Sequence, residues 1–160
     1  MSIENQKTVE IYKLKASKYM ETSLLHDKLD QEKAELKSKK LYEFLKSSFE
    51  ILPKNSNVLE IGSADGSNAK YIENLGFRIT ASDIAEDFIK ACKEKGLNTI
   101  EFNLLEDNFK EKYTGILAWR VFVHFTSNDI LKALIKIYGN LENNGIFVFN
   151  VINRDTKKCR

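Results

Sequence analysis

Short apolar runs alternate with amphipathic segments over the last two thirds of this chain, and this alternation restricts the folds open to it. The runs predict strands at residues 58–61, 77–81, 99–102, 115–118 and 146–152, and the intervening segments predict helices at 68–75, 87–95 and 126–141. Consecutive parallel strands need crossover connections of this kind, because a tight turn cannot join them. The pattern therefore predicts an α/β fold with a parallel sheet of about five strands covered by helices.

Helix signals occur before the first predicted strand and before the last one. Thr126 and Asp129 have the spacing of a capping box, so we expect the last helix to begin there and to continue to Leu141. Before the first strand, an apolar stripe at intervals of three and four predicts a helix; it consists of Leu41, Leu45, Phe49 and Leu52. A shorter helix is expected at 9–20. We therefore expect residues 1–55 to form a helical cap and residues 56–160 the core.

Composition narrows the class of protein. A chain of 160 residues, 42% of them hydrophobic, has the size and the apolar content of a single domain. Its net charge of +2 gives no reason to expect nucleic acid as a partner. It lacks an apolar stretch of the ~20 residues that would span a membrane, and its start does not resemble a signal peptide. Cys92 and Cys159 are too isolated to suggest a zinc site or a disulfide framework. We expect a cytoplasmic protein with no metal site and no membrane partner.

The end of the first predicted strand has the features of a ligand site. Gly62 and Gly66 flank a turn that leads into a helix, whose N–H groups favour an anion. Asp83 ends the second strand, and a carboxylate there can accept hydrogen bonds from the hydroxyls of a ribose. The structural alternative is that the glycines only shape a βα turn and that Asp83 caps the next helix. The nicotinamide fingerprint fits poorly, since it would need glycine at Ala64 and Ser67 as well.

The segment Glu60-Ile61-Gly62-Ser63-Ala64-Asp65-Gly66 resembles the first motif of class I S-adenosylmethionine-dependent methyltransferases, with Ala64 in place of the middle glycine. The resemblance covers nearly the whole chain and implies a doubly wound, Rossmann-like fold with N-terminal helices over the cleft. It also implies S-adenosylmethionine as cofactor. The positions that correspond to the family's cofactor contacts are Tyr19, Glu60, Gly62, Ser63, Ala64, Gly66, Asp83, Ile84, Asn103, Leu104 and Trp119.

The loop after the fourth strand resembles the family's loop that ends in a histidine, but Trp119-Arg120 stands where an Asn and a small residue are usual. His124 is the candidate general base, with packing beside Phe122 and Phe125 as the alternative. Tyr12 is either a cofactor contact or an ordinary helix residue. The resemblance implies methyl transfer to an O or N atom of a small-molecule acceptor. Two other functions stay open: a non-catalytic binding module of the same fold and, less favoured, a nicotinamide-dependent oxidoreductase.

The family's fold normally continues beyond the fifth strand, whereas this sequence ends at Arg160. A fifth strand at the margin of the sheet would leave an unpaired hydrophobic edge. We therefore expect the 160-residue chain to be less stable than a full domain of the family, or to associate with itself through that edge.

Overall fold

The computed structural model describes residues 3, 6–16, 18 and 31–151, so Tyr19, His26 and the residues from 152 onward lie outside the described part. Residues 6–16 are helical. The later elements are α2 (Gln31–Phe49), β1 (Asn57–Ile61), α3 (Ser67–Asn74), β2 (Arg78–Asp83), α4 (Glu86–Glu94), β3 (Asn98–Glu101), β4 (Tyr113–Ala118), the 3₁₀ helix η1 (Phe122–His124), α5 (Ser127–Asn140) and β5 (Leu141–Phe149). No described helix is both long and apolar enough to cross a membrane.

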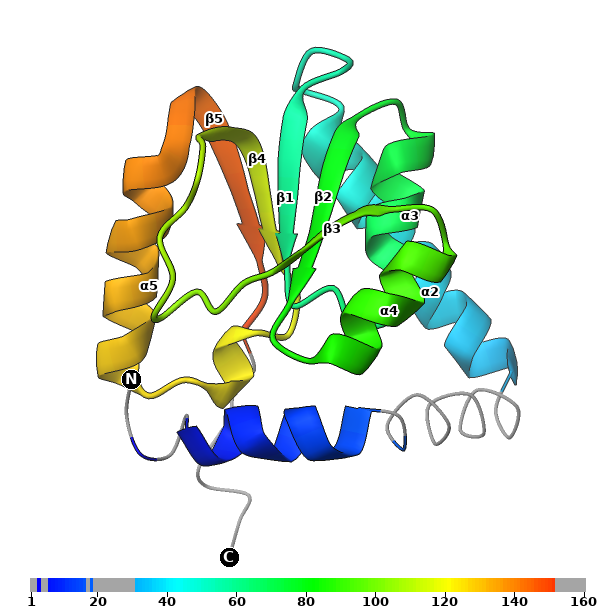
Figure 1. Cartoon of the computed structure of the whole chain (residues 1–160). Coiled ribbons are helices and arrows are strands. Elements are labelled where there is room, and N and C mark those ends of the chain that lie inside the picture. The colour runs from blue at the N-terminus through cyan, green and yellow to red at the C-terminus, as the bar shows by residue number, and fades with distance from the viewer. Residues whose placement is uncertain (1–2, 4–5, 17, 19–30, 152–160) are drawn as a thin grey trace, which may run out of the picture.

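The five strands form one parallel sheet in the order β3-β2-β1-β4-β5 (Figure 1). The chain moves outward from β1 through β2 to β3, then returns to the other side of β1 with β4 and β5. The order therefore reverses next to β1, and ligands of open α/β sheets bind at such a point, beyond the carboxyl ends of the strands. The predicted α/β fold with a doubly wound parallel sheet is confirmed.

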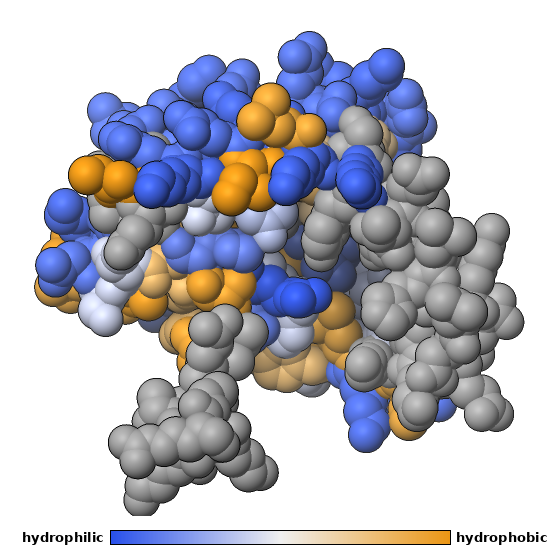
Figure 2. All heavy atoms as spheres, turned by 90° about the horizontal axis from the view of Figure 1, so that it is seen from below, coloured by the Kyte–Doolittle hydropathy of each residue, from blue (hydrophilic) through white to orange (hydrophobic). Residues whose placement is uncertain are grey.

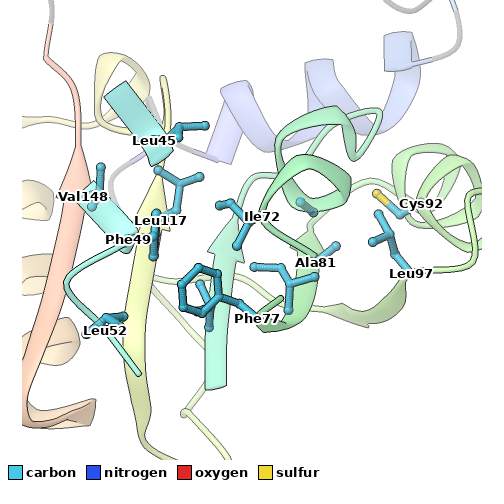
Figure 3. Packing of buried hydrophobic residues seen from close by; sticks show 13 residues of the cluster. Leu45, Phe49, Leu52, Ile72, Phe77, Ala81, Cys92, Leu97, Leu117 and Val148 are labelled. Atoms are coloured by element: carbon cyan, nitrogen blue, oxygen red, sulfur yellow. The ribbon is translucent and has the colours of Figure 1, made fainter. Parts of the chain in front are cut away.

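Each face of the sheet has its own hydrophobic core. On one face, Leu45 and Phe49 of α2 pack with Ile72 of α3 and with Leu117 and Val148 of the sheet (Figure 3). On the other face, α5 and the segment between β3 and β4 cover a second cluster, which includes Leu59, Phe102, Tyr113, Ile116 and Ile137. Successive residues of a strand point to opposite faces, which explains why Leu59 and its neighbour Val58 belong to different clusters. The predicted apolar stripe of α2 is therefore the part of this helix that covers the sheet.

The main difference from the sequence-based expectation concerns the end of α5. The cap is confirmed: the Thr126 hydroxyl accepts the N–H of Asp129 at 3.3 Å. Leu141, expected as the last residue of the helix apolar face, instead begins β5 and pairs with Tyr113 of β4. From this pair to the next, β4 advances from 113 to 115 and β5 from 141 to 146, so β5 contains a bulge, with Asn144 at φ 63°. The predicted start of β5 at residue 146 was therefore wrong, because the bulge separates an early pair from the regular register.

Residues 6–16 lie across the carboxyl ends of the strands (Figure 1). Ala16 is fully buried with Ala85 and Phe88, at the start of α4. Lys13 adds an ion pair with Glu101 at 3.8 Å. Seen from below in Figure 2, the outer surface at this edge is mostly hydrophilic with hydrophobic side chains between. The N-terminal helix thus covers the edge of the sheet at which a ligand would bind.

Replacing Leu45 by alanine should lower the free energy of unfolding by about 2–5 kcal/mol, because the side chain is fully buried between α2 and the sheet. The matched control is Leu36→Ala on the same helix, where the side chain is 54% exposed and the loss should stay below about 1 kcal/mol. Urea unfolding of both variants measures the difference. Equal losses would contradict the assignment of the buried face of α2.

Association of the chain through β5 stays a prediction. Within the described residues, β4 is the only strand that pairs with β5, and Phe149 near its end is 42% exposed. Unpaired strand edges favour pairing with another chain. Sedimentation velocity at increasing concentration should show a growing dimer fraction. A single monomer boundary at the highest concentration would count against this association.

Candidate functional site

A cavity of about 510 Å³ lies between the carboxyl ends of β1, β2 and β4 and the N-terminal helix. Its volume lies within the ~300–1,000 Å³ that is usual for small-molecule sites. Ten candidate site residues from the sequence line it: Tyr12, Gly62, Ser63, Ala64, Asp83, Ile84, Asn103, Leu104, Trp119 and His124. Glu60 and Gly66 lie outside this lining. A second cavity of about 470 Å³, beside β3, contains none of the singled-out residues.

The turn after β1 needs three left-handed backbone positions, at alternate residues. Gly62, Ala64 and Gly66 have φ values of 70°, 47° and 76°. A side chain at Gly66 would meet the Cys92 sulfur and Leu97 at 2.8 Å, so glycine is required there for packing as well. Ala64 adopts the same left-handed region in spite of its Cβ, at a cost of about 1–2 kcal/mol. The turn therefore accommodates alanine at the middle position of the motif, with some backbone strain.

Hydrogen bonds attach this turn to β2. The Ser63 N–H donates to the carbonyl of Ser82 at 2.8 Å, and the Ser82 N–H donates to the Ser63 hydroxyl at 3.1 Å. The Ala64 N–H donates to Oδ2 of Asp83 at 3.0 Å. Because every one of these bonds crosses from the turn to the end of β2, the two halves of the predicted nucleoside site are fixed relative to each other.

Asp83 has a structural role and also faces the cavity. Its Oδ1 accepts the N–H groups of Ile84 at 2.8 Å and Ala85 at 3.1 Å, directly before α4. The structural alternative from the sequence, that Asp83 caps the next helix, is wrong: the N-cap of α4 is Ala85 with no side-chain cap, and Asp83 holds the backbone just before the helix. A carboxylate has about four acceptor positions, so three backbone donors leave roughly one for a ligand. Burial raises the pKa of Asp83, although the backbone N–H groups act in the opposite direction.

Glu60 lies in β1, directly before the turn, and is fully buried. Its Oε1 accepts from the Asn68 amide at 3.2 Å, whereas its Oε2 has no hydrogen-bond partner among the described residues. Burial raises the pKa of this carboxyl to about 8. Near neutral pH the side chain is therefore largely protonated, which reduces the cost of an unpaired buried oxygen.

The residues after β3 form a compact turn beside the cavity. The Asn103 side-chain carbonyl accepts the Leu105 N–H at 3.1 Å, and the Asn103 N–H donates to Asp107 at 2.7 Å. Leu104 is buried, and both it and Ile84 contribute apolar surface to the cavity. Asn103 thus fixes the turn with its amide oxygen and its backbone N–H.

His124, in η1, faces the N-terminal helix. Its Nε2 lies 3.0 Å from the Tyr12 hydroxyl, and the two rings meet edge to face with centroids 5.1 Å apart. Burial, and then the positive charge of Arg120, lower the pKa of His124. The imidazole is therefore neutral at physiological pH and can accept a proton. Tyr12, one of the ambiguous residues in the sequence, contacts this candidate base directly.

Trp119 belongs both to the hydrophobic core and to the cavity lining. It packs against the core cluster that contains Leu45, lies 5.9 Å from Phe44 between ring centroids, and also lines the cavity. The sequence analysis did not identify Tyr42 of α2, which lines the cavity and stacks on Tyr71 with centroids 4.4 Å apart. Only the packing of α2 beside the sheet brings Tyr42 to the site. In the described part of the chain, no group of His, Cys, Asp and Glu could hold a metal ion.

Glu60→Gln tests the buried carboxyl. The pKa of Glu60 is about 8 in the folded chain against an ordinary value near 4.5, so the folded state binds more protons between these two values. The stability of the wild type must therefore fall as the pH rises through this window. The variant lacks this titration. As the pH rises, its free energy of unfolding should therefore increase relative to that of the wild type by up to about 1.4 kcal/mol per pH unit. Urea unfolding at pH 5, 6, 7 and 8 measures this difference in the free energy of unfolding. The control is Glu94→Gln, at an exposed position. A difference independent of pH would rule out the raised pKa.

Comparison with solved structures shows where this fold occurs. DhpI, in a complex with SAM and HEP, matches 98% of this chain with 71% of its own, at 16% identity and a TM-score of 0.72. A TehB-like SAM-dependent methyltransferase from Corynebacterium glutamicum matches at 19% identity and a TM-score of 0.57, over 62% of this chain and 56% of its own. The N-methyltransferase NodS from Bradyrhizobium japonicum, in complex with S-adenosyl-L-homocysteine, matches at 22% identity and a TM-score of 0.59, over 69% and 60%. At these identities the likeness shows the fold.

The chain spans less than two thirds of the length of the Corynebacterium and Bradyrhizobium proteins. A search among curated proteins finds no match. The family model described as a methyltransferase domain matches residues 30–159, from α2 through the fifth strand. This match covers most of the sequence and includes the turn after β1, Asp83 and His124, and the chain therefore belongs to the methyltransferase-domain family.

Proposed function

We propose that this chain binds S-adenosylmethionine in the cavity at the carboxyl edge and transfers its methyl group to an O or N atom of a small-molecule acceptor. One observation supports this function above all: the first residues of the left-handed turn after β1, the Asp83 carboxylate and the neutral His124 line a single cavity. Structures of similar fold, DhpI and NodS, were solved with SAM and with S-adenosyl-L-homocysteine. The membership of the chain in the methyltransferase-domain family agrees with the same activity.

The cavity has a suitable surface for each part of the cofactor. The remaining acceptor position of Asp83 suits a ribose hydroxyl, and Ile84 and Leu104 offer apolar surface to an adenine ring. Because Gly62 has no Cβ, a ligand can approach the backbone of the turn closely. These residues would hold the nucleoside at the ends of β2 and β3 and leave the methionine part near the turn after β1.

The bound cofactor supplies a methyl group that is already activated by its positive sulfur. The chain must then hold the acceptor in line with that group and keep water away. The N-terminal helix covers the cavity with Thr8, Val9 and Tyr12, which serves the second purpose. His124 can take the proton of a hydroxyl or ammonium acceptor, because its lowered pKa keeps the imidazole neutral.

A non-catalytic module of the same fold is the other function that the sequence left open. Ala64, one reason for it, adopts a left-handed backbone conformation that a glycine would adopt without strain, so this residue does not by itself argue against the proposed activity. Binding without turnover, with all plausible acceptor classes supplied, would favour the module. A cytoplasmic location and the absence of nucleic-acid and membrane partners remain predictions.

Asp83→Asn should weaken the binding of S-adenosylmethionine at least tenfold, because it replaces a charged acceptor by a neutral amide at the predicted ribose contact. Glu94→Gln, an exposed acid on α4 outside the cavity lining, is the matched control and should bind like the wild type. Isothermal titration calorimetry with S-adenosylmethionine, S-adenosylhomocysteine and NAD measures the affinities. Unchanged affinity in a folded Asp83→Asn variant would place the ribose elsewhere, and preferential binding of NAD would overturn the proposed function.

A further inference from the structure

Arg120 brings a positive charge to the cavity that no described carboxylate neutralises. Its guanidinium forms no ion pair and no hydrogen bond with the residues that the structure describes. Arg78, the other arginine in this part of the chain, donates from Nε to the carbonyl of Asn55 at 3.0 Å. A guanidinium has five donors in a planar fork that matches the oxygens of a carboxylate or a phosphoryl group. Arg120 therefore has its full donor set available to a ligand.

The backbone at Arg120 is held in a conformation that any side chain makes unfavourable. Its φ is 61°, in the left-handed region that favours glycine. The Arg120 N–H donates to the side-chain oxygen of Asn150, just beyond β5, and this bond holds the residue in place. Backbone strain of this kind occurs preferentially at ligand sites. The fold thus fixes a charged residue at a position where glycine would fit without strain.

The carboxylates that line the cavity interact with groups other than Arg120. Asp65 pairs with Lys95 at 2.8 Å, and Asp83 accepts three backbone N–H groups. The residues that follow Arg120 in the same loop and line the cavity are mainly apolar, among them Val121 and Val123. Arg120 itself is exposed, so water screens its charge, but no carboxylate of the described residues competes for the guanidinium. This part of the cavity is therefore electrostatically suited to an anion.

Arg120 also lies within electrostatic reach of the candidate base, since its positive charge contributes to the lowered pKa of His124. Both residues line the same cavity, and His124 contacts Tyr12 of the covering helix. An anionic group held by Arg120 would leave the rest of a small molecule beside the neutral imidazole. This is the arrangement that a methyl acceptor needs if His124 is to take its proton.

We propose that Arg120 binds an anionic group of the acceptor, a carboxylate or a phosphoryl group, and so restricts the acceptor to small anionic molecules. The inference rests on the proposed function, and it makes Arg120 a residue that determines specificity and takes no part in proton transfer. The carboxylate of the cofactor itself has the same chemistry, so the test must separate the two sources.

The experiment adds acetate or, separately, methylphosphonate to the protein saturated with S-adenosylhomocysteine, at constant ionic strength, and follows the imidazole resonances by NMR. The chain contains two histidines, so a His124→Gln variant identifies the signal of His124. In the wild type we expect a saturable shift and a rise in the pKa of His124, because a bound anion offsets the charge of Arg120. The affinity should fall at least tenfold in Arg120→Gln and stay unchanged in Arg78→Gln. Stronger binding of acetate would indicate a carboxylate acceptor, and stronger binding of methylphosphonate a phosphoryl acceptor.

Two results would overturn the inference. One is a weak, non-saturable response that is the same in the wild type and in Arg120→Gln. The other is a tenfold loss of S-adenosylhomocysteine affinity in Arg120→Gln together with no anion response in the loaded wild type, which would assign the guanidinium to the cofactor carboxylate. If S-adenosylhomocysteine fails to bind at all, the proposed function is wrong, and the same titration of the protein alone still tests anion binding at Arg120.

Discussion

The attachment of the turn after β1 to the end of β2 is the constraint on which the rest of the site depends. The turn can pass over the end of the sheet because Gly62, Ala64 and Gly66 all adopt left-handed conformations. The Asp83 carboxylate then holds the turn by accepting the Ala64 N–H, and it supports the start of α4 through the N–H groups of Ile84 and Ala85. One side chain therefore joins three elements and also faces the cavity, so the carboxylate that we propose as a ligand contact also stabilises the fold.

The cavity is completed by a segment far away in the sequence. The N-terminal helix is docked by the burial of Ala16 against Ala85 and Phe88, and its Tyr12 reaches His124 on the opposite side of the site. Burial there keeps the imidazole neutral, and the charge of Arg120 acts in the same direction. The covering helix thus has two physical effects, since it excludes water from the cavity and takes part in setting the protonation state of the candidate base.

Charge is distributed unevenly between the loops around the cavity. The acids belong to the turn after β1 and to the end of β2, where backbone N–H groups and Lys95 occupy most of their acceptor positions. The loop after β4 contributes Arg120, whose guanidinium has no acidic partner in the described residues. The loop after β4 is thus the part of the site best placed to select an acceptor by its charge.

The sequence by itself determined the order of strands and helices, the parallel sheet, the cap of α5 at Thr126 and the positions of the turn and of Asp83, because hydrophobic periodicity, capping and glycine requirements are local properties. The early start of β5 at Leu141 could not be predicted, since a bulge is defined only by the pairing with Tyr113. The tertiary structure alone decided that Glu60 is buried with a raised pKa, that Tyr12 meets His124 and that Arg120 has no acidic partner among the described residues. Burial and charge proximity depend on residues that are distant in the sequence, and no local pattern encodes the distances between them.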